Sequence, residues 1–467
     1  MRHLALFTVV VLAGCGSAPK PAAAPSSPMR AGASKVKITP EKFGWMTGYG
    51  NRNKPADGVK QELWVRSLLM EDGAGKQVVM VSADILGFPP KMCEDMRRLA
   101  GQRFGLPESA MMFIATHTHG GPAIPQRPSM EIFHGLDETT GRDVFEYAAW
   151  LQERVMESIA GALQARKPAK LTFTKATATF GMNRRFRNPN GTWSIKDNPE
   201  GLVDPEVTIV RAESLEGAPI ATVFTYACHC TTLGGDIYQY HGDWSGVACD
   251  ELEKSTGVPA LFATGCGADL NPSPRGKFEF ADQHGKAMAK AVLEAPAGAP
   301  LVGPIRTKLK MIDLPLEKLP GYDLLRQLEG DVEKNKNVFR QRHTKVLFRQ
   351  YRSDTMPGQV PFPIQAWHFG DQVLVALGGE TCVEYALRLK KEIGPVGKTW
   401  VVGYANGVMC YIPSEKVLTE SGYEAGWDPA TGKTIAGGSM MYYGWAVPFA
   451  SGIENRIIAA ARALVSE

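Results

Sequence analysis

Two histidines, His117 and His119, lie two residues apart in the stretch ATHTHGGP, directly after an apolar run. Alternate side chains share a face in an extended chain, so both imidazoles would point to one place while Thr116 and Thr118 point away. Neutral imidazole is a good zinc ligand, and a catalytic zinc site needs about three protein ligands plus an open position. The spacing therefore indicates a metal site, although two buried structural histidines would give the same pattern.

A third histidine, His229, lies between two cysteines in the stretch YACHCTTLGG. The same alternation places Cys228 and Cys230 on one face and His229 on the other, which argues against a Cys/His/Cys metal site. His229 is then free to face a cleft while the cysteines pack inward. A buried structural histidine is the alternative.

Glu380 ends the run VLVALGGE, where two glycines precede a helical pattern. A carboxylate at the end of a strand is well placed to reach a cation. A glutamate in the first turn of a helix is also favoured by the helix dipole. The local sequence alone favours this second interpretation.

Near-continuous apolar runs and helical patterns alternate along the chain and would position these residues. The apolar runs are typical of strands covered on both faces, and apolar spacing predicts helices over 143–166, 281–295 and 381–393. We expect an α/β fold with layered, mixed or parallel sheets flanked by helices in a single large catalytic domain. Ligands should collect beyond the carboxyl ends of the strands. The runs are QVVMVSADILGF, SAMMFIATHTH, APIATVFTYACHC, VPALFATGCG and QVLVALGGE.

The segment 319–354 differs from the rest because it is rich in Lys, Arg and Glu and has few apolar positions. This composition predicts a solvated helical excursion. A cap over the active site is the alternative.

The composition describes an ordinary globular chain, with 44% hydrophobic residues, 21% charged residues and a net charge of +4. No tail of one charge sign is present, so we expect no nucleic-acid partner. Apart from Cys15, the chain has seven cysteines, which cannot all pair, and most lie in apolar segments. We expect few or no disulfides. The oligomeric state is left open.

The N-terminus, MRHLALFTVVVLAGCG, has a basic start, a short apolar stretch and small residues before Cys15. It resembles a bacterial lipoprotein signal, and the apolar run is too short for a transmembrane helix. The resemblance implies a signal peptide over 1–14, a lipidated Cys15 with a flexible tether over 15–34, and the catalytic domain over 35–467. The expected location is the bacterial cell envelope, periplasmic or at the outer membrane, with a membrane anchor at Cys15.

Eight fragments of the sequence resemble, in order and approximate spacing, the N-terminal catalytic domain of the neutral/alkaline ceramidase family. Together they span roughly residues 35 to 455. The fragments are MTGYGNRNKPADGVKQELWVRSLLMED, VSADILGF, ATHTHGGP, NRRFR, ACHCTTLGG, GADLNP, LGGETCVEYALRL and CYIPSEKVLTESGYEAG.

This resemblance implies a site with one zinc ion. The implied metal ligands are His117, His229, Glu380 and Tyr411, and the implied substrate-handling groups are His119, Arg184 and Tyr423. By itself Tyr411 would be interpreted as a half-buried aromatic residue.

The implied reaction is hydrolysis of an acyl bond, above all an N-acyl amide, by attack of zinc-bound hydroxide at neutral pH. His119, Arg184 and Tyr423 would stabilise the oxyanion. The substrate would be a small-molecule or lipid-like N-acyl compound. An esterase or lactonase using the same site is one alternative, and a noncatalytic surface lipoprotein that binds metal or another ligand is the other.

The sequence departs from the family at a turn that carries a serine in ceramidases. Here Asn271 occupies that place, and an amide cannot act as a nucleophile. We therefore expect Asn271 to orient the substrate, since Ser273 has a proline on each side. We also expect no C-terminal β-sandwich after Tyr423, which leaves ceramide open as the substrate.

Three aspartates lie close to these motifs in the sequence, Asp84, Asp243 and Asp269. We expect their carboxylates to fix imidazole tautomers and turn geometry by accepting hydrogen bonds. A second metal near His241, Asp243 and Asp269 is the alternative.

Overall fold

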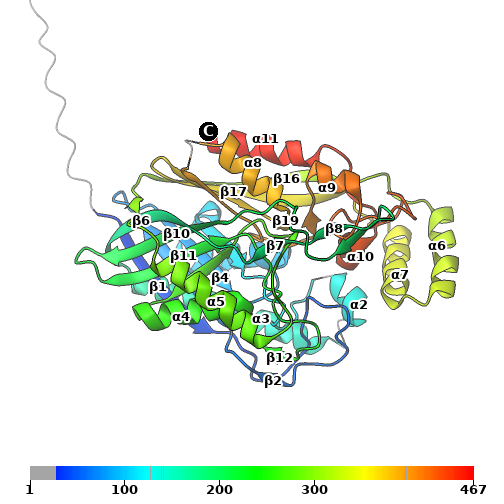
Figure 1. The fold of residues 1–467 in the computed structure, drawn as a ribbon, viewed down its shortest axis with the longest axis horizontal. Helices are drawn as coiled ribbons and strands as arrows, with labels where there is room; N and C mark the ends of the chain where they lie inside the picture. The colour runs from blue at the N-terminus through cyan, green and yellow to red at the C-terminus, as the bar shows by residue number, and fades with distance from the viewer. Residues whose placement is uncertain (1–27, 127, 138, 140, 395–396, 467) are drawn as a thin grey trace, which may run out of the picture.

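Two β-sheets stack face to face, and helices cover the outer face of each sheet (Figure 1). The computed structural model describes residues 28–466, apart from 127, 138, 140, 395 and 396. The layers run helix, sheet, sheet, helix, and the sheets contain both parallel and antiparallel pairs. The predicted α/β architecture of layered sheets flanked by helices is confirmed.

The larger sheet has nine strands, in the order β13-β11-β10-β6-β1-β3-β4-β5, with β15 pairing to β6. The pairs β11/β13 and β4/β5 are parallel, and the other pairs are antiparallel. The strands are β1 (Arg30–Lys37), β3 (Trp64–Glu71), β4 (Gln77–Ala83), β5 (Met111–Ala115), β6 (Lys167–Thr177), β10 (Glu206–Ser214), β11 (Pro219–Tyr226), β13 (Ala260–Thr264) and β15 (Ala299–Pro300).

The smaller sheet has four strands, in the order β16-β17-β18-β20. Four two-stranded pairs, β2/β12, β7/β14, β8/β9 and β19/β21, lie outside both sheets. The strands of the smaller sheet are β16 (Ile305–Pro315), β17 (Gln359–Phe369), β18 (Gln372–Leu377) and β20 (Thr399–Val402), and the paired strands are β2 (Gly58–Val59), β12 (Gln239–Tyr240), β7 (Gly181–Asn183), β14 (Leu270–Pro272), β8 (Arg185–Arg187), β9 (Trp193–Ile195), β19 (Glu380–Thr381) and β21 (Tyr411–Ile412).

The apolar run in β4 buries both of its faces because neighbouring side chains point in opposite directions. Val78 and Met80 pack into the core between the two sheets. Val79 and Val81 pack on the other side against the helices. The same alternation in the other runs explains why they contain few polar positions.

Helix α3 (Arg142–Gln164) follows the apolar stripe that the sequence predicts. Val144, Leu151, Val155 and Ile159 are buried, and the helix packs on β1 and β3. The remaining helices are α1 (Pro90–Phe104), α2 (Ser129–His134), α4 (Asp243–Thr256), α5 (Phe278–Leu293), α6 (Tyr322–Asn335), α7 (Val338–Arg352), α8 (Val383–Glu392), α9 (Glu415–Glu420), α10 (Gly438–Tyr443) and α11 (Ile453–Ser466), with a 3-10 turn at Glu108–Ala110.

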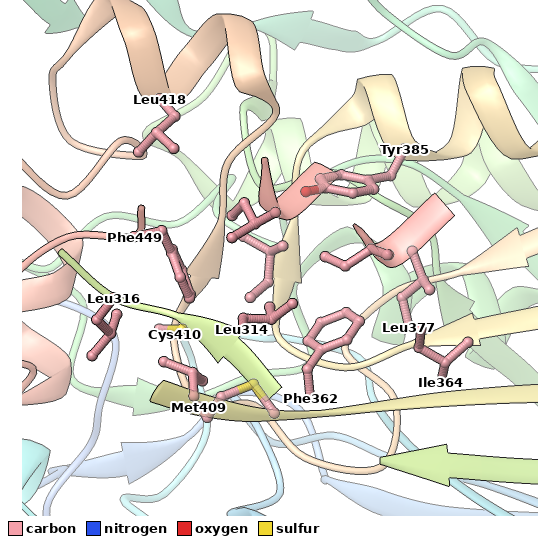
Figure 2. Packing of buried hydrophobic residues seen from close by; sticks show 14 of the residues in the cluster. Leu314, Leu316, Phe362, Ile364, Leu377, Tyr385, Met409, Cys410, Leu418 and Phe449 are labelled. Carbon is pink, nitrogen blue, oxygen red and sulfur yellow. The ribbon is translucent and has the colours of Figure 1, made fainter. Parts of the chain in front are cut away.

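The outer core of the smaller sheet joins strands, helices and the C-terminal segment (Figure 2). Phe362 and Leu377 come from the sheet, Tyr385 comes from α8, and Phe449 comes from the loop before α11. All four are fully buried. This core fixes α8, which begins at Val383, three residues after Glu380.

The segment 403–406 follows β20 and links the ends of two strands of the larger sheet, β5 and β13. The Gly403 amide donates to the Thr264 carbonyl (2.9 Å), and the Asn406 amide donates to the Phe113 carbonyl (2.7 Å). The Thr264 hydroxyl donates to the Ala115 carbonyl (2.7 Å). These bonds hold the carboxyl ends of β5 and β13 together, and the loop that carries His117 and His119 begins at the end of β5.

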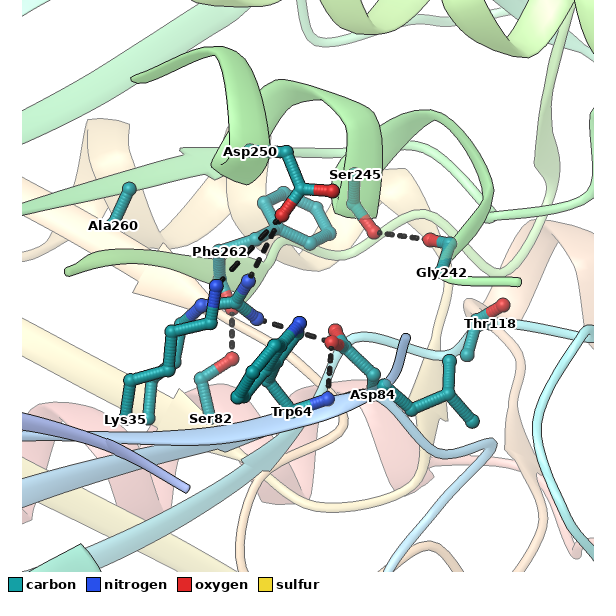
Figure 3. Close-up of polar contacts among 12 residues, drawn as sticks. Lys35, Trp64, Ser82, Asp84, Thr118, Gly242, Ser245, Asp250, Ala260 and Phe262 are labelled. Atoms are coloured by element: carbon teal, nitrogen blue, oxygen red, sulfur yellow. Dashed lines mark hydrogen bonds and ion pairs between the residues drawn. The ribbon is translucent and has the colours of Figure 1, made fainter. Parts of the chain in front are cut away.

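A buried ion pair joins the larger sheet to α4. The Arg66 guanidinium contacts Asp84 at 3.0 Å and Glu253 at 2.8 Å. Asp84 also accepts from the Trp64 amide, as Figure 3 shows, with Asp250 of α4 nearby. Arg66 and Asp84 are each about 1% exposed. The expectation that Asp84 fixes an imidazole is wrong, because Arg66 takes its carboxylate.

The remaining predictions on chain organisation have mixed outcomes. The seven described cysteines are buried and free. The signal peptide (1–14), Cys15 and most of the tether lie outside the described residues, and β1 begins at Arg30, before the expected domain start at residue 35. Within the described residues, no helix has the length and hydropathy needed to cross a bilayer.

We predict that Asp84→Asn lowers the free energy of unfolding by about 3 kcal/mol, because it leaves the buried Arg66 charge short of one partner. Asp95→Asn is the matched control, since Asp95 forms an exposed pair with Lys91, and it should cost less than about 1 kcal/mol. Denaturant unfolding measures both, and equal losses would contradict this role of Asp84.

Candidate active site

Four side chains from distant parts of the chain meet at one point: His117, His229, Glu380 and Tyr411. Glu380 Oε2 lies 3.1 Å from His117 Nε2 and 3.3 Å from His229 Nε2. The Tyr411 hydroxyl lies 3.2 Å from His229 Nε2. All four residues are buried. These are the four residues expected as metal ligands, and the fold brings them together.

Each of the four residues follows or forms a strand end. His117 follows β5, His229 follows β11, and Glu380 is aligned with Tyr411 in the parallel pair β19/β21. The two histidine loops are tied together because the His119 amide donates to the Cys230 carbonyl at 3.2 Å. The four side chains therefore lie at or beyond the ends of strands, which is where the sequence predicts that a ligand binds.

The backbone at His117 differs from the expected extended chain. Its φ is +60°, in the left-handed region, so simple alternation does not explain why His117 and His119 converge. Their Nε2 atoms nonetheless lie 3.3 Å apart. The alternation at His229 holds, because Cys228 and Cys230 pack in the core against α4 and β11.

Backbone carbonyls fix the tautomers of two imidazoles. His117 Nδ1 donates to the Leu86 carbonyl at 2.6 Å, and His229 Nδ1 donates to the Gly267 carbonyl at 2.7 Å. A carbonyl only accepts, so in the neutral rings both Nε2 atoms carry lone pairs. These lone pairs face Glu380 Oε2, which is buried and has no hydrogen-bond donor among the described residues.

This donor set fits a metal ion. Glu380 Oε2 lies 3.1 and 3.3 Å from two nitrogen acceptors, and acceptors this close repel one another unless a cation lies between them. Zinc bonds of about 2.0–2.1 Å in a tetrahedron give edges of about 3.3 Å. His119 also lies within reach, since its ring and those of His117 and His229 could share one ion. The geometry therefore offers His119 as a nitrogen ligand as well as a substrate-handling group.

The protonation states suit a cation. Burial and the nearby Arg184 guanidinium lower the pKa of His229 to about 3, and burial beside His117 and His229 lowers the pKa of His119. Neutral imidazoles and an ionised carboxylate are the forms that bind metal.

Arg184 connects this cluster to the residues expected to handle substrate. Its Nη2 donates to the Tyr411 hydroxyl at 3.0 Å, and its Nη1 donates to Asn271 Oδ1 at 3.2 Å. Its charge lies 5.9 Å from the centre of the Tyr423 ring. Arg184, Asn271 and Tyr423 therefore lie together beside the cluster, as the sequence predicts.

Several residues of the site were missed by sequence reasoning. Glu424 is buried between Arg184 and Arg185 and contacts each at 2.9 Å. Tyr443 donates to Glu380 Oε1 at 2.6 Å, and the Tyr404 ring lies 4.4 Å from that of His117. Of these residues, only Glu424 could have been proposed from the sequence, because it directly follows Tyr423.

The two remaining aspartates have the expected role in turns but not the expected role at the imidazoles, and the Ser273 hydroxyl is bonded elsewhere, in line with its expected lack of a catalytic role. Asp243 accepts from the Thr232 and Leu233 amides, and Asp269 accepts from the Val383 amide, so they shape turns and do not fix the imidazole tautomers. His241 Nδ1 accepts from the Asp243 amide. The Ser273 hydroxyl donates to Asp197 on the surface.

A cleft with two chambers opens at the cluster. The inner chamber, which contains the cluster, and the polar chamber share one wall, formed by Gly48, His119, Phe133, Tyr411, Tyr423 and Tyr442. The inner chamber adds the apolar side chains of Leu86, Ile124, Met130 and Val408 and the polar side chains of Thr47, His117, Gln126, Ser129, His134 and Glu380. The polar chamber adds Tyr49, Gly50, Arg184, Ile195, Thr231, Asn271 and Arg275.

The segment 319–354 forms α6 and α7 at one end of the molecule (Figure 1). Helix α7 contacts α2 and α10, and its Phe339 packs against Phe133 and Tyr442. No described residue of 319–354 lines either chamber. The segment is therefore a helical excursion that supports the cleft wall from behind, and the alternative of a cap is not what the structure shows.

A model of the N-terminal region of the neutral/alkaline non-lysosomal ceramidase family matches residues 30–265, just over half of the chain. The chain belongs to this family. The matched region includes His117, His119, Arg184 and His229, and it ends before Asn271, Glu380, Tyr411 and Tyr423.

Curated relatives and solved structures agree with this membership. Neutral ceramidase B of Dictyostelium discoideum is 25% identical over 50% of the chain and 33% of its own length. Neutral ceramidase of Pseudomonas aeruginosa is 25% identical over 54% of the chain and 38% of its own length. The alignments thus span little more than a third of these relatives.

The crystal structure of the Pseudomonas aeruginosa neutral ceramidase superposes with a TM-score of 0.66 at 19% identity. The superposition covers 94% of the chain and 75% of that structure. At this identity the likeness shows the fold. It extends the resemblance to the half of the chain that carries Glu380 and Tyr411.

We predict that Gly48→Ala lowers the free energy of unfolding by about 3 kcal/mol. Gly48 has φ +95°, and an added Cβ would lie 2.4 Å from His119 Nδ1. Gly75→Ala is the matched control, with φ +82° and open space around it, so it should show only the backbone cost of about 1 to 2 kcal/mol. Denaturant unfolding measures both variants, and losses of the same size would contradict a close contact with His119.

Proposed function

We propose that the chain is a zinc-dependent hydrolase that cleaves an acyl bond, above all an N-acyl amide, as members of its family do. The convergence of two imidazole lone pairs on a buried carboxylate oxygen carries this proposal. His117, His229, Glu380 and Tyr411 would hold the ion. Zinc in that place supplies a Lewis acid that makes water nucleophilic at neutral pH.

The residues around the cluster supply binding and orientation. His119, Arg184 and Tyr423 line the wall shared by the two chambers or lie next to it, where a substrate carbonyl would lie. Their N–H and O–H groups can donate to the oxyanion that develops when a carbonyl is attacked. Asn271 lines the polar chamber and orients the substrate there.

Four apolar side chains of the inner chamber, those of Leu86, Ile124, Met130 and Val408, support a lipid-like acyl group as part of the substrate. They line the same chamber as Glu380 and His117, so an acyl chain in contact with them would lie near the cluster. Apolar side chains that combine with a small set of polar groups are the usual lining of a ligand site. The ceramide amide remains within this class.

We predict that the purified chain binds about one zinc ion and hydrolyses N-dodecanoyl amides. His229→Ala should lose most of the zinc and the turnover, because it removes a ligand from the cluster. His368→Ala is the matched control, since His368 lies on β17 away from the cluster, and it should keep both. Metal analysis and amine release provide the measurements.

Two outcomes would contradict this proposal. Full zinc occupancy without hydrolysis of any amide or ester in a broad acyl panel would favour a noncatalytic metal-binding protein. Faster cleavage of matched dodecanoyl esters, with no measurable amide cleavage, would identify an esterase or lactonase.

We further propose that Cys15 is lipidated and anchors the chain in a bacterial cell envelope, at the periplasmic side or the outer membrane. The small residues before Cys15 in the sequence support this proposal. We predict that Cys15→Ser moves the chain from the membrane pellet to the soluble fraction. Cys93→Ser is the control, because Cys93 is a buried core residue, and an unchanged distribution of both variants would exclude the anchor.

A further inference from the structure

The polar chamber contains the guanidinium of Arg275, whose charge no carboxylate of the described residues neutralises. Arg275 is half-buried, and its only hydrogen bond among the described residues is a long one, 3.5 Å from Nη2 to the Tyr49 hydroxyl. No carboxylate of the described residues forms an ion pair with it. The Tyr49 hydroxyl in turn donates to the Leu233 carbonyl.

The other arginine of the chamber is compensated. Arg184 is paired with the buried Glu424, which also binds Arg185. Arg185 has a second carboxylate partner in Glu420, at 3.2 Å. The charges of Arg184 and Arg185 are therefore balanced by Glu420 and Glu424. Arg275, in contrast, adds a net positive charge to a chamber that no described Asp or Glu lines.

Asn271 adds hydrogen-bond donors to the same chamber. Its Oδ1 lies 3.2 Å from Arg184 Nη1 and 3.1 Å from the Thr231 hydroxyl. A guanidinium has only donors, so the atom that it contacts must be the amide oxygen. The Nδ2 group then points the other way, and no described residue accepts a hydrogen bond from it. The chamber presents donors to a ligand.

We infer that the amine half of the substrate carries a carboxylate, which Arg275 and Asn271 bind, so that the substrate is an N-acyl amino acid. This inference rests on the proposed function. The acyl chain lies in the inner chamber against Leu86, Ile124, Met130 and Val408, the amide at the shared wall and the carboxylate in the polar chamber. A neutral amino alcohol in the same place would remove water from Arg275 without giving it a counter-ion.

The reaction balances without another reactant. The oxygen of water bonds to the acyl carbon, the C–N bond breaks, and the amine nitrogen takes a proton. The products are a fatty acid and an amino acid. Arg275 keeps its charge throughout, because it binds the carboxylate and takes no part in the proton transfers.

The experiment compares two conjugates that differ in the charge of the amine half, N-dodecanoylglycine and N-dodecanoylethanolamine. The measured quantity is the ratio of their kcat/KM values for the zinc-loaded full chain. We expect the wild type to favour the glycine conjugate by at least about 10-fold, because a charge-assisted hydrogen bond between Arg275 and the carboxylate contributes about that factor to binding. Arg275→Gln should reduce the ratio by about 10-fold, and Arg275→Lys should keep much of it.

Arg98→Gln is the matched control, since Arg98 is an exposed residue on α1, and its ratio should equal that of the wild type. A ratio near one in the wild type, or a ratio that Arg275→Gln leaves unchanged, would overturn the inference while the hydrolase stands.

Calorimetry separates the inference from the proposed function. If the wild type cleaves neither conjugate, the hydrolase proposal fails, and both conjugates can be titrated as uncleaved ligands. A Kd for N-dodecanoylglycine that rises about 10-fold in Arg275→Gln would then support a carboxylate site. Equal Kd values in the two proteins would overturn it.

Discussion

The meeting of two imidazole lone pairs with a buried carboxylate oxygen is the constraint on which the rest of the structure depends. The lone pairs on His117 and His229 lie 3.1 and 3.3 Å from the Glu380 oxygen and are repelled by it, so the surrounding fold has to hold the three side chains in place. Carbonyls of Leu86 and Gly267 fix the rings, and the Tyr443 hydroxyl holds the other oxygen of Glu380. Each contact comes from a different segment of the chain, two loops and helix α10, which makes the site a product of tertiary structure.

The layered fold was largely readable from the sequence because its signals are local. The alternation of side chains in β4 and the stripe on α3 follow from the periods of strands and helices, and they report burial directly. The opposite directions of His229 and its neighbouring cysteines also follow from a local rule. These predictions needed no knowledge of which elements become neighbours.

The details of the site could not be predicted in the same way, because they depend on contacts between remote segments. The left-handed backbone at His117 has no signal in its own sequence. The register that aligns Glu380 with Tyr411 comes from a strand pair 31 residues apart, and the role of the Leu86 and Gly267 backbone carbonyls leaves no mark on the side chains of their loops. Family resemblance named the four proposed ligands, whereas only the structure shows what orients them.

The segment 403–406 has a second consequence beyond holding β5 and β13 together. A strand at the margin of a sheet exposes unpaired amides and carbonyls that can recruit a strand from another molecule. Here Ala405 bridges to Ile114, and Asn406 pairs with Phe113 through its amide and its side chain. The same few residues that shape the cleft therefore cover a margin that would otherwise favour aggregation.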